Sequence, residues 1–427
     1  MATARGVITV QIASNIESHL VKPLHPIDEI AARISQADGD GVRLTRGASS
    51  KSLNGLTALV DPVAAVMQAL AEPLDFPPLA AGIVPGDRVA IAIDSTVPCV
   101  AKVVRGVMEA LQSAGVELPD ISIVTADSQT STRCREELEG SEEGPLIVIH
   151  DPADDNSLCL VGTMKRGEPL LVTREIFDAD VILPISCARV NNENAFVGLF
   201  PQFTGAEMLN YYRAPVNRES VANRQHSETD EAGRLIGVLM SIQVVPGRGE
   251  TVSQVVAGEP HAVARRCEAL CREEWSLRSP ERVSLLIATV TGGTASQTWA
   301  NVGRALEAAE NVVEEDGVVA ICTNLEEQPG HSLGRLVRNS DIDRAARKIF
   351  HDSDADSWPA WQVARALQRG AVYFLSQLSD ETVEDLGMAP VESVDDIVRL
   401  AGRHGSFAVL EDAQHAAVTV GSDDHDE

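Results

Sequence analysis

Asp94 and Thr96 are the first side chains whose position along the sequence suggests ligand binding. They follow the apolar run 88–93, which is typical of a buried strand. Ligands of α/β proteins bind at the carboxyl ends of such strands. Thr96 could donate a hydrogen bond to a phosphate or a hydroxy acid, and Asp94 could accept one from a ribose or orient a cation. Both residue types also cap helices, and a helix is predicted from about 98 to 114, so the sequence leaves both interpretations open.

Two more polar positions follow the next predicted strands. Strand 121–125 leads into a polar turn that contains Thr130, and strand 146–149 leads into His150 and Asp151. Thr130 could form a hydrogen bond with a small polar ligand, or simply belong to a solvated turn. His150 could act as an acid or base with Asp151, or bind a metal, because imidazole titrates near neutral pH. The alternative is a histidine at a strand end that is satisfied by the backbone.

A second group of candidates lies after strand 283–289, where the turn contains Gly292 and Gly293. Paired glycines let a ligand approach the backbone closely. In the helix predicted from about 299 to 313, Asn301 and Arg304 stand three residues apart and share a face. They offer an amide and a cation to the same ligand.

An aromatic candidate lies further along the chain. Trp358 or Trp361 could pack on a ligand ring, and either could equally belong to the core.

The elements that position these residues alternate between buried apolar strands and helices. This pattern predicts an α/β fold whose sheets are mainly parallel and joined by right-handed crossovers. Before these elements we predict a strand at 7–13, a helix at 26–35, and a helix that begins at Asp61 with Pro62 in its first turn. The segment 248–278 is predicted to be helical, and a turn is predicted at 315–317. We predict two domains, 1–270 and 271–420, each with such a sheet flanked by helices, and a ligand cleft between them. The acidic tail 421–427 has no apolar residue to bury beyond its first glycine and is predicted to be disordered.

Composition limits the possible partners. The chain has 427 residues and a formal charge of -28, which argues against nucleic acid and anionic membranes and leaves a small-molecule ligand as the expected partner. Its 7 cysteines are scattered, which argues for a reducing compartment. No apolar run reaches the roughly 18 residues of a membrane span, and no signal peptide is evident, so we expect a cytoplasmic protein. The oligomeric state stays open.

The order and spacing of motifs from 87 to 205 resemble the N-terminal half of the nickel-dependent lactate racemase family. The resemblance is carried by Asp94-Ser95-Thr96-Val97-Pro98, by His150-Asp151 and by the stretch from Val161 to Pro184, and it extends over roughly 55 to 420. It implies racemisation of 2-hydroxy acids by hydride transfer to a nickel-pincer nucleotide, which a lysine tethers, while two histidines exchange the proton.

Several family positions hold other residues in this chain. Val97 stands where the family has an arginine, Thr130 where it has a histidine, and Val197 where it has the tethering lysine. No lysine lies between Arg166 and Lys348, which excludes a tether in this segment. The resemblance also places Cys187 near the second family histidine, and Tyr211, Tyr212 and Arg213 near a nickel-binding histidine.

The sequence therefore predicts a lactate racemase-like protein that binds or acts on a small 2-hydroxy acid in the cleft between its domains. Its cofactor is unknown, and if it is active it is an isomerase of the racemase or epimerase type. The alternative is a non-catalytic paralogue that binds or senses a small metabolite. A dinucleotide-dependent dehydrogenase ranks last, because no Gly-x-Gly-x-x-Gly follows a predicted strand. No metal site is predicted; the candidate catalytic residues are His150 and Arg304, and the candidate substrate-binding residues are Asp94, Thr96, Thr130, Gly292, Gly293, Asn301 and Trp358.

Overall fold

The computed structural model of the chain describes residues 57–138, 144–216 and 218–421, and residues 30, 33–34 and 45–46 before them. The chain divides into an N-terminal unit, Leu56–Arg272, and a C-terminal unit, Glu273–Glu427, which is grouped with Met1–Gly55. The strand predicted at 7–13, most of the helix predicted at 26–35 and all but the first residue of the acidic tail lie outside the described residues. The domain limits at 270 and 420 and the cleft between the domains stay predictions.

The N-terminal unit is built on a six-stranded sheet with the strand order β4-β3-β2-β7-β8-β9. Neighbouring strands run parallel from β4 to β8, and β9 is antiparallel to β8. The strands are β2 (Val89–Ile93), β3 (Ile121–Thr125), β4 (Leu146–Ile149), β7 (Val181–Cys187), β8 (Ser241–Pro246) and β9 (Val252–Gly258).

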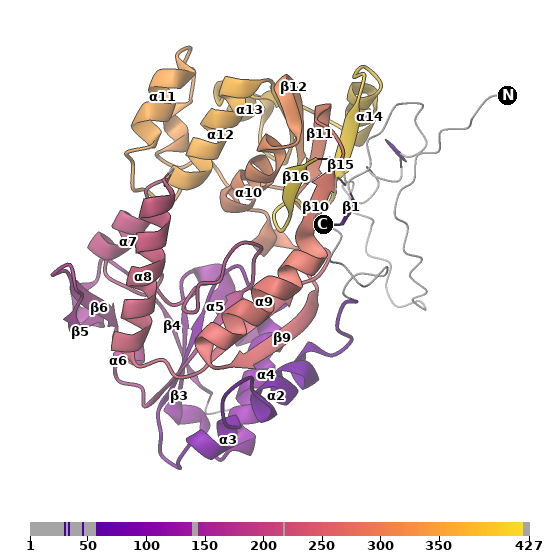
Figure 1. The fold of residues 1–427 in the computed structure, drawn as a ribbon. Helices are drawn as coiled ribbons and strands as arrows, with labels where there is room; N and C mark the ends of the chain where they lie inside the picture. Colours follow the sequence, from indigo (N-terminus) through magenta and orange to yellow (C-terminus); the bar gives the residue numbers. More distant parts are fainter. Residues whose placement is uncertain are drawn as a thin grey trace. The chain divides into compact units, whose positions relative to one another are not determined.

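Helices surround this sheet, and an antiparallel hairpin of β5 (Leu158–Thr163) and β6 (Pro169–Thr173) lies outside it (Figure 1). The first helix begins as predicted, with Pro62 in its first turn and the Asp61 carboxylate accepting a hydrogen bond from the Ala64 amide at 3.1 Å. The helices are α2 (Pro62–Ala71), α3 (Leu79–Gly82), α4 (Val100–Ser113), α5 (Ser128–Leu138), α6 (Arg174–Phe177), α7 (Ala206–Arg213), α8 (Glu219–Ile236) and α9 (Pro260–Trp275).

Strand β2 explains why this sheet is parallel and buried. Ile91 and Ile93 face the core formed with α2 and α4, whereas Ala90 and Ala92 face a second core that contains Phe196. A strand with apolar residues on both faces needs cover on both sides, which helix crossovers provide in a parallel sheet.

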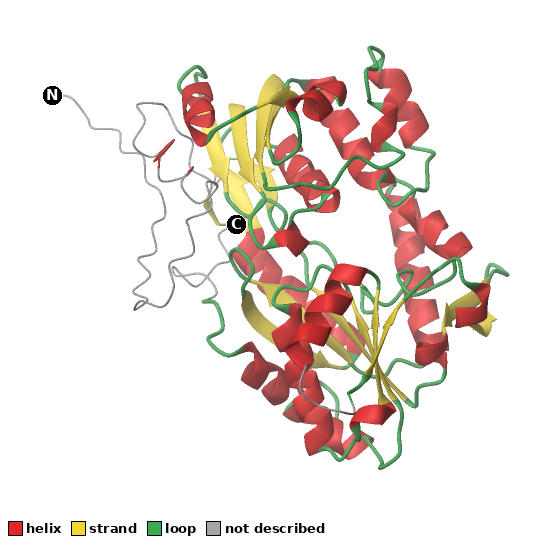
Figure 2. Ribbon diagram, turned by 180° about the vertical axis from the view of Figure 1, so that it is seen from behind, coloured by secondary structure: helices red, strands yellow, loops and turns green. Residues whose placement is uncertain are grey.

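The C-terminal unit is built on a five-stranded sheet with the order β14-β13-β12-β11-β15, in which every neighbouring pair is parallel. Figure 2 shows the strands of both sheets with helices packed beside them. The strands are β11 (Val283–Thr289), β12 (Val313–Cys322), β13 (Val372–Leu375), β14 (Ala389–Pro390) and β15 (Phe407–Leu410), and the helices are α10 (Trp299–Glu310), α11 (Ile342–Ile349), α12 (Ser357–Arg369), α13 (Asp380–Asp385) and α14 (Val394–Ala401).

Residues from the start of the chain contribute to this C-terminal unit. Ile30 and Ile34 are buried in its core with residues of β11 and α14. Strand β1 (Thr45–Arg46) pairs with β10 (Ser276–Ser279), which also pairs with β16 (Ala417–Val420). These described residues therefore pack with the C-terminal unit, although the sequence assigns the whole of 1–270 to the N-terminal domain.

The alternation of strands and helices is confirmed, so both units have the predicted α/β fold with mainly parallel sheets. The segment 248–278 is wrongly predicted as helical throughout, because it contains β9 and β10 on either side of α9. The turn predicted at 315–317 lies inside β12, where Asp316 has a φ of 62° and the pairing with β11 shifts register. None of the helices in the described part of the chain is long and apolar enough to cross a membrane.

In each sheet, the chain adds strands first on one side of the starting strand and then on the other side. In the N-terminal unit the chain adds β3 and β4 on one side of β2 and then β7 on the other. In the C-terminal unit it adds β12, β13 and β14 on one side of β11 and then β15 on the other. The carboxyl ends of β2 with β7, and of β11 with β15, are therefore the topological switch points at which open α/β sheets bind ligands.

Candidate functional site

Asp94 and Thr96 lie at the first switch point, directly after β2. The Asp94 carboxylate accepts hydrogen bonds from the Thr96 hydroxyl at 2.9 Å and from the Thr96 amide at 3.0 Å. Helix α4 begins at Val100, and its N-cap is Cys99, which makes no side-chain capping bond. The helix-cap interpretation of Asp94 and Thr96 is therefore wrong, and the pair instead forms a closed turn at the strand end.

The loop after β7 approaches this turn. Gly198 has a φ of 83°, and a Cβ atom there would lie 3.0 Å from the Asp94 Cβ and 2.7 Å from the Ser186 Cβ. The same loop carries Arg189, whose Nη1 is buried without a hydrogen-bond partner. A buried guanidinium nitrogen without a partner is costly, so it marks a place where an anion or a water would be stabilised.

Thr130 lies in the first turn of α5, where the sequence predicts a polar turn. Its amide and its hydroxyl both donate to the Asp127 carboxylate at 2.8 Å, which is the usual arrangement at a helix N-terminus. The residue is 3% exposed. Since the Thr130 hydroxyl is committed to Asp127, its local role is to start the helix.

His150 is buried, and both of its ring nitrogens have partners. Nε2 lies 3.0 Å from the Thr204 carbonyl oxygen, and Nδ1 lies 2.8 Å from the Thr173 hydroxyl. The carbonyl requires a donor, so Nε2 carries the proton and the Thr173 hydroxyl donates to Nδ1. Burial lowers the pKa of His150, while the Thr204 bond and Asp151 oppose this shift. The arrangement is that of a neutral histidine satisfied within the fold.

At the second switch point, a buried glutamine organises the loop after β11. Gln297 donates to the Gly292 carbonyl at 3.1 Å and to the Val290 carbonyl at 3.2 Å. Its Oε1 accepts from the Thr323 hydroxyl and the Asn324 amide, both at 2.7 Å. Gly292 has a φ of 98°, which glycine adopts without strain. Sequence reasoning singled out the glycines but missed Gln297, which links the ends of β11 and β12.

Asn301, Arg304 and Trp358 lie together on α10 and α12. The Arg304 guanidinium donates to the Asn301 Oδ1 at 2.7 Å, and its carbon lies 5.9 Å from the centre of the Trp358 ring. The Asn301 amide group donates to the Ser296 carbonyl at 2.7 Å, which fixes it to the loop before α10. A cation close to an indole ring is stabilised by the ring quadrupole. The amide, the cation and the indole of the sequence prediction thus form one cluster.

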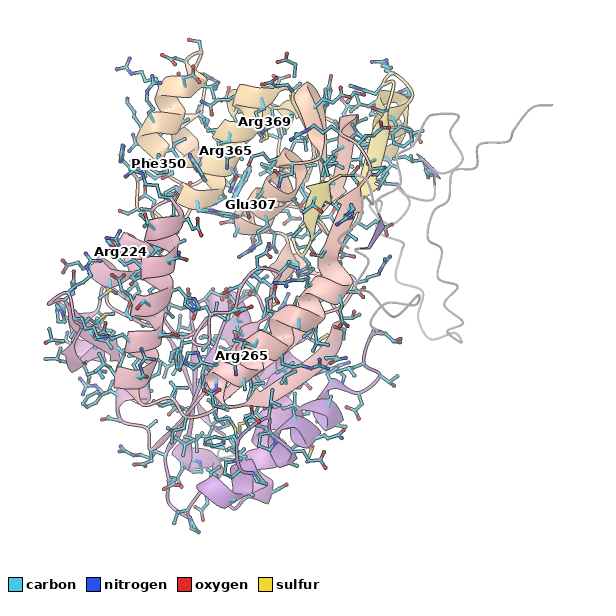
Figure 3. The ribbon with its side chains drawn as sticks, in the orientation of Figure 1. Arg224, Arg265, Glu307, Phe350, Arg365 and Arg369 are labelled. Atoms are coloured by element: carbon cyan, nitrogen blue, oxygen red, sulfur yellow. The ribbon has the colours of Figure 1, made fainter. Side chains whose placement is uncertain are left out.

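The two helices that carry this cluster are joined by ion pairs. Arg369 lies 3.3 Å from the Glu310 carboxylate, and Arg365 pairs with the same carboxylate. Figure 3 labels Arg365 and Arg369 on α12 and Glu307 on α10. Trp358 rests on Gly303, where a Cβ atom would lie only 2.8 Å from the indole. Trp361 instead contacts Phe350 and Arg365, so Trp358 is the tryptophan of the cluster.

Polar residues after β15 complete the second switch point. Asp412 accepts a hydrogen bond from the Thr291 hydroxyl, and Gln414 donates to the Thr291 carbonyl at 3.3 Å. The Thr289 Oγ1 and the Gln414 Oε1 are buried without a hydrogen-bond partner. No local sequence pattern singles out Thr289 and Gln414, because they come to the same sheet end only when β15 lies beside β11.

Comparison with known proteins identifies the N-terminal part. Residues 45–190 match a domain family. That family is the lactate racemase N-terminal domain. No protein of curated function matches the chain.

The lactate racemase likeness extends to solved structures over most of the chain. The lactate racemase apoprotein from Thermoanaerobacterium thermosaccharolyticum superposes with a TM-score of 0.68 at 16% identity, over 88% of this chain and 99% of that one. A protein of known crystal structure from Thermotoga maritima gives a TM-score of 0.62 at 12% identity, over 84% of this chain and 99% of that one. At such identities the likeness concerns the fold, which is that of lactate racemase.

The residues that we predicted to occupy the family's cofactor positions offer no group that could tether a nickel-pincer nucleotide. Val97, which the sequence prediction aligns with the family arginine, is 4% exposed and packs in an apolar core. Val197 has no nucleophile, and Cys187 is a buried thiol close to its neighbour's carbonyl. Nowhere in the described ranges do three His, Cys, Asp or Glu side chains gather in a way that could hold a metal ion.

Proposed function

We propose that the chain is a lactate racemase-like protein that binds a small 2-hydroxy acid without a lysine-tethered cofactor. The observation that carries this proposal is the cluster of Asn301, Arg304 and Trp358, in which the Asn301 amide also bonds to Ser296 in the loop before α10. A guanidinium recognises a carboxylate through two parallel N–H donors, and the Asn301 contact holds this one in a defined orientation.

The carboxyl end of β11 supports the same ligand class. Thr289 and Gln414 each bury a polar oxygen without a partner, and such a group costs about 1 to 3 kcal/mol. The α-hydroxyl of a hydroxy acid could donate to the Gln414 oxygen and accept from the Thr289 hydroxyl. Thr289 extends from the face of β11 that carries Leu285 and Ile287, whereas α10 packs against the other face, so the hydroxyl contact is tested separately from the carboxylate contact to Arg304.

A second candidate function is binding without turnover. His150, the only residue we predicted as a candidate acid or base from the N-terminal unit, is buried and has both nitrogens engaged. A general base must reach the proton that it removes, which His150 can do only after breaking these contacts. The protein would then sense or carry a small metabolite without racemising it.

We also propose a cytoplasmic location. The 7 cysteines are free thiols, which is in keeping with a reducing compartment.

Calorimetric titration of the full-length protein with both enantiomers of lactate, and with propionate, tests the ligand class. We expect lactate to bind more tightly than propionate, because only lactate offers a hydroxyl. Arg304→Ala should weaken lactate binding by about tenfold or more, and Arg304→Lys should restore part of it. Arg338→Ala, at an exposed arginine paired with Asp385, is the matched control. Unchanged lactate affinity in Arg304→Ala would overturn the proposal.

Turnover separates the two candidate functions. The protein is incubated with one lactate enantiomer, and the appearance of the other is followed by chiral chromatography. Racemisation that is lost in Arg304→Ala would favour an enzyme. Tight binding with no racemisation, even after co-expression with enzymes that make the nickel-pincer nucleotide, would favour a binding protein.

A further inference from the structure

The N-terminal unit contains a pocket of about 510 Å³ that none of the residues discussed above explains. It lies between the β5–β6 hairpin, the segment that begins at Pro152, and helices α7 and α8. Figure 1 shows the hairpin next to α7 and α8. This volume is typical of sites for small organic molecules. The residues of the proposed hydroxy-acid site are not among those that line it.

The wall of the pocket is largely apolar. Hairpin residues Leu158, Met164 and Leu171 meet Met208 of α7 and the ring of Pro152. Methionine side chains adapt their shape to different ligands, so this surface suits a compact apolar body better than one rigid outline.

Two tyrosines add aromatic surface at one side. The rings of Tyr211 and Tyr212 meet edge to face, with their centres 5.1 Å apart. The Tyr212 hydroxyl donates to the Glu228 carboxylate at 2.5 Å. Burial raises the pKa of Tyr212 most, and the hydrogen bond to Glu228 raises it further. Tyr212 therefore remains protonated and fixed, so its ring forms a stable wall.

The charged residues that line the pocket are mostly acidic. There are five carboxylates, from Asp155, Glu168, Glu207, Glu228 and Glu231, against the one guanidinium of Arg166.

The guanidinium is neutralised within the fold. It lies 2.9 Å from Glu228 and 3.2 Å from Glu168, and it donates to the Tyr211 hydroxyl at 2.8 Å. These contacts raise the pKa of Arg166, with the Glu228 bond contributing most. An anionic ligand would therefore meet uncompensated carboxylates, whereas a cation would be attracted by them and by the tyrosine rings.

We propose that this pocket binds a small organic cation, an amine or quaternary ammonium attached to an apolar body. The apolar body would lie against the methionine and leucine surface, and the charge would lie near Glu231 and the tyrosines. This inference is independent of the hydroxy-acid function, because all of the lining residues belong to the N-terminal unit and none is in the Arg304 cluster.

The test compares three probes that share one apolar body: phenethylamine, phenethyl alcohol and phenylacetate. Binding to the full-length protein is measured by calorimetry and by protein-observed NMR. We expect the amine to bind about tenfold or more tightly than the alcohol, and phenylacetate to bind most weakly. Equal affinity for the amine and the alcohol, or no binding of the amine up to about 10 mM, would overturn the proposal, since a weaker site falls outside the usual affinity range.

Variants locate the binding event. Glu231→Gln removes a charge but keeps an oxygen to accept the hydrogen bond from the Lys165 amide, which the carboxylate accepts at 2.7 Å. It should weaken amine binding about three- to tenfold and leave the alcohol unchanged. Ala206→Phe, at a half-buried wall position, should reduce binding of both. Glu219→Gln, on the same helix but outside the lining, is the control. If the amine affinity is unchanged in both Glu231→Gln and Ala206→Phe, the amine binds outside this pocket and the proposal is wrong.

Discussion

The two switch points of the molecule differ in how their polar groups are used. After β2 and near the strands beside it, Thr96 bonds to Asp94, Thr130 bonds to Asp127, and His150 is enclosed by the fold. One nitrogen of Arg189, in the loop after β7, is the exception, because it is buried without a partner. After β11 and β15, an amide holds an arginine against a tryptophan, and two buried oxygens have no partner.

This contrast indicates that the fold and the reactive groups of a lactate racemase-like chain can diverge separately. The sheet of the N-terminal unit needs only apolar strands and tight turns, which any residues of suitable shape supply. Its predicted reactive positions now contribute to packing and helix capping. The C-terminal unit holds the groups to which our proposal assigns the ligand.

The strongest test of this contrast restores the family arginine. Val97→Arg would bury a charge in an apolar core, because Val97 is 4% exposed and packs with buried residues of β2 and α4. We expect a loss of about 3 to 5 kcal/mol in the free energy of unfolding, measured by urea denaturation. Val97→Ala, which only removes two methyl groups, should cost less. A stable Val97→Arg protein with improved lactate binding would show that the N-terminal site is still open to repair.

The next largest effect concerns His150. His150→Ala removes a buried ring and leaves the Thr204 carbonyl and the Thr173 hydroxyl without that partner, so we expect a loss of about 2 to 4 kcal/mol in stability. Lactate affinity should not change. The exposed His226 provides the control, and His226→Ala should cost less than about 0.5 kcal/mol. A stable variant that no longer binds lactate would show that His150 takes part in ligand binding.

The pH dependence of stability gives a smaller effect at the same residue. The folded-state pKa of His150 lies below its ordinary value because of burial. The unfolded chain therefore takes up this proton first as the pH falls, so the stabilising contribution is complete above about pH 6.5 and is lost below it. Between about pH 7 and 5 the unfolding free energy of the natural protein should fall more steeply than that of His150→Gln. Parallel curves for the two proteins would contradict a buried neutral imidazole.

Local sequence signals predicted the fold well, but they predicted only some of the contacts at the candidate site. Strand 121–125 and the Asp61 cap were predictable because a run of apolar residues and a capping motif act within a few positions. The hairpin of β5 and β6 was not predictable, since buried and exposed residues do not alternate regularly along its half-exposed strands. The position of Thr130 in α5 is not predictable from its surroundings, because serine and threonine favour turns and helix starts alike.

The site itself depends on contacts across long stretches of sequence. Gln297 meets Thr323, and Gln414 meets Thr291, over separations that no local pattern encodes. The pair of Asn301 and Arg304 was predictable because both lie within one turn of one helix.

The smallest effect separates structural from ligand-binding hydroxyls at the second switch point. Thr289→Val removes a buried hydroxyl that has no partner, so the unliganded protein should be unchanged or up to about 1 kcal/mol more stable. Thr323→Val is the matched control, because its hydroxyl donates to Gln297 at 2.7 Å and its loss should cost about 1 to 2 kcal/mol. If the Thr289 hydroxyl contacts the ligand, Thr289→Val should weaken lactate about three- to tenfold and leave propionate unchanged. Equal destabilisation by the two substitutions would mean that Thr289 is held by water, and an unchanged lactate affinity would leave Arg304 to bind the acid without help from β11.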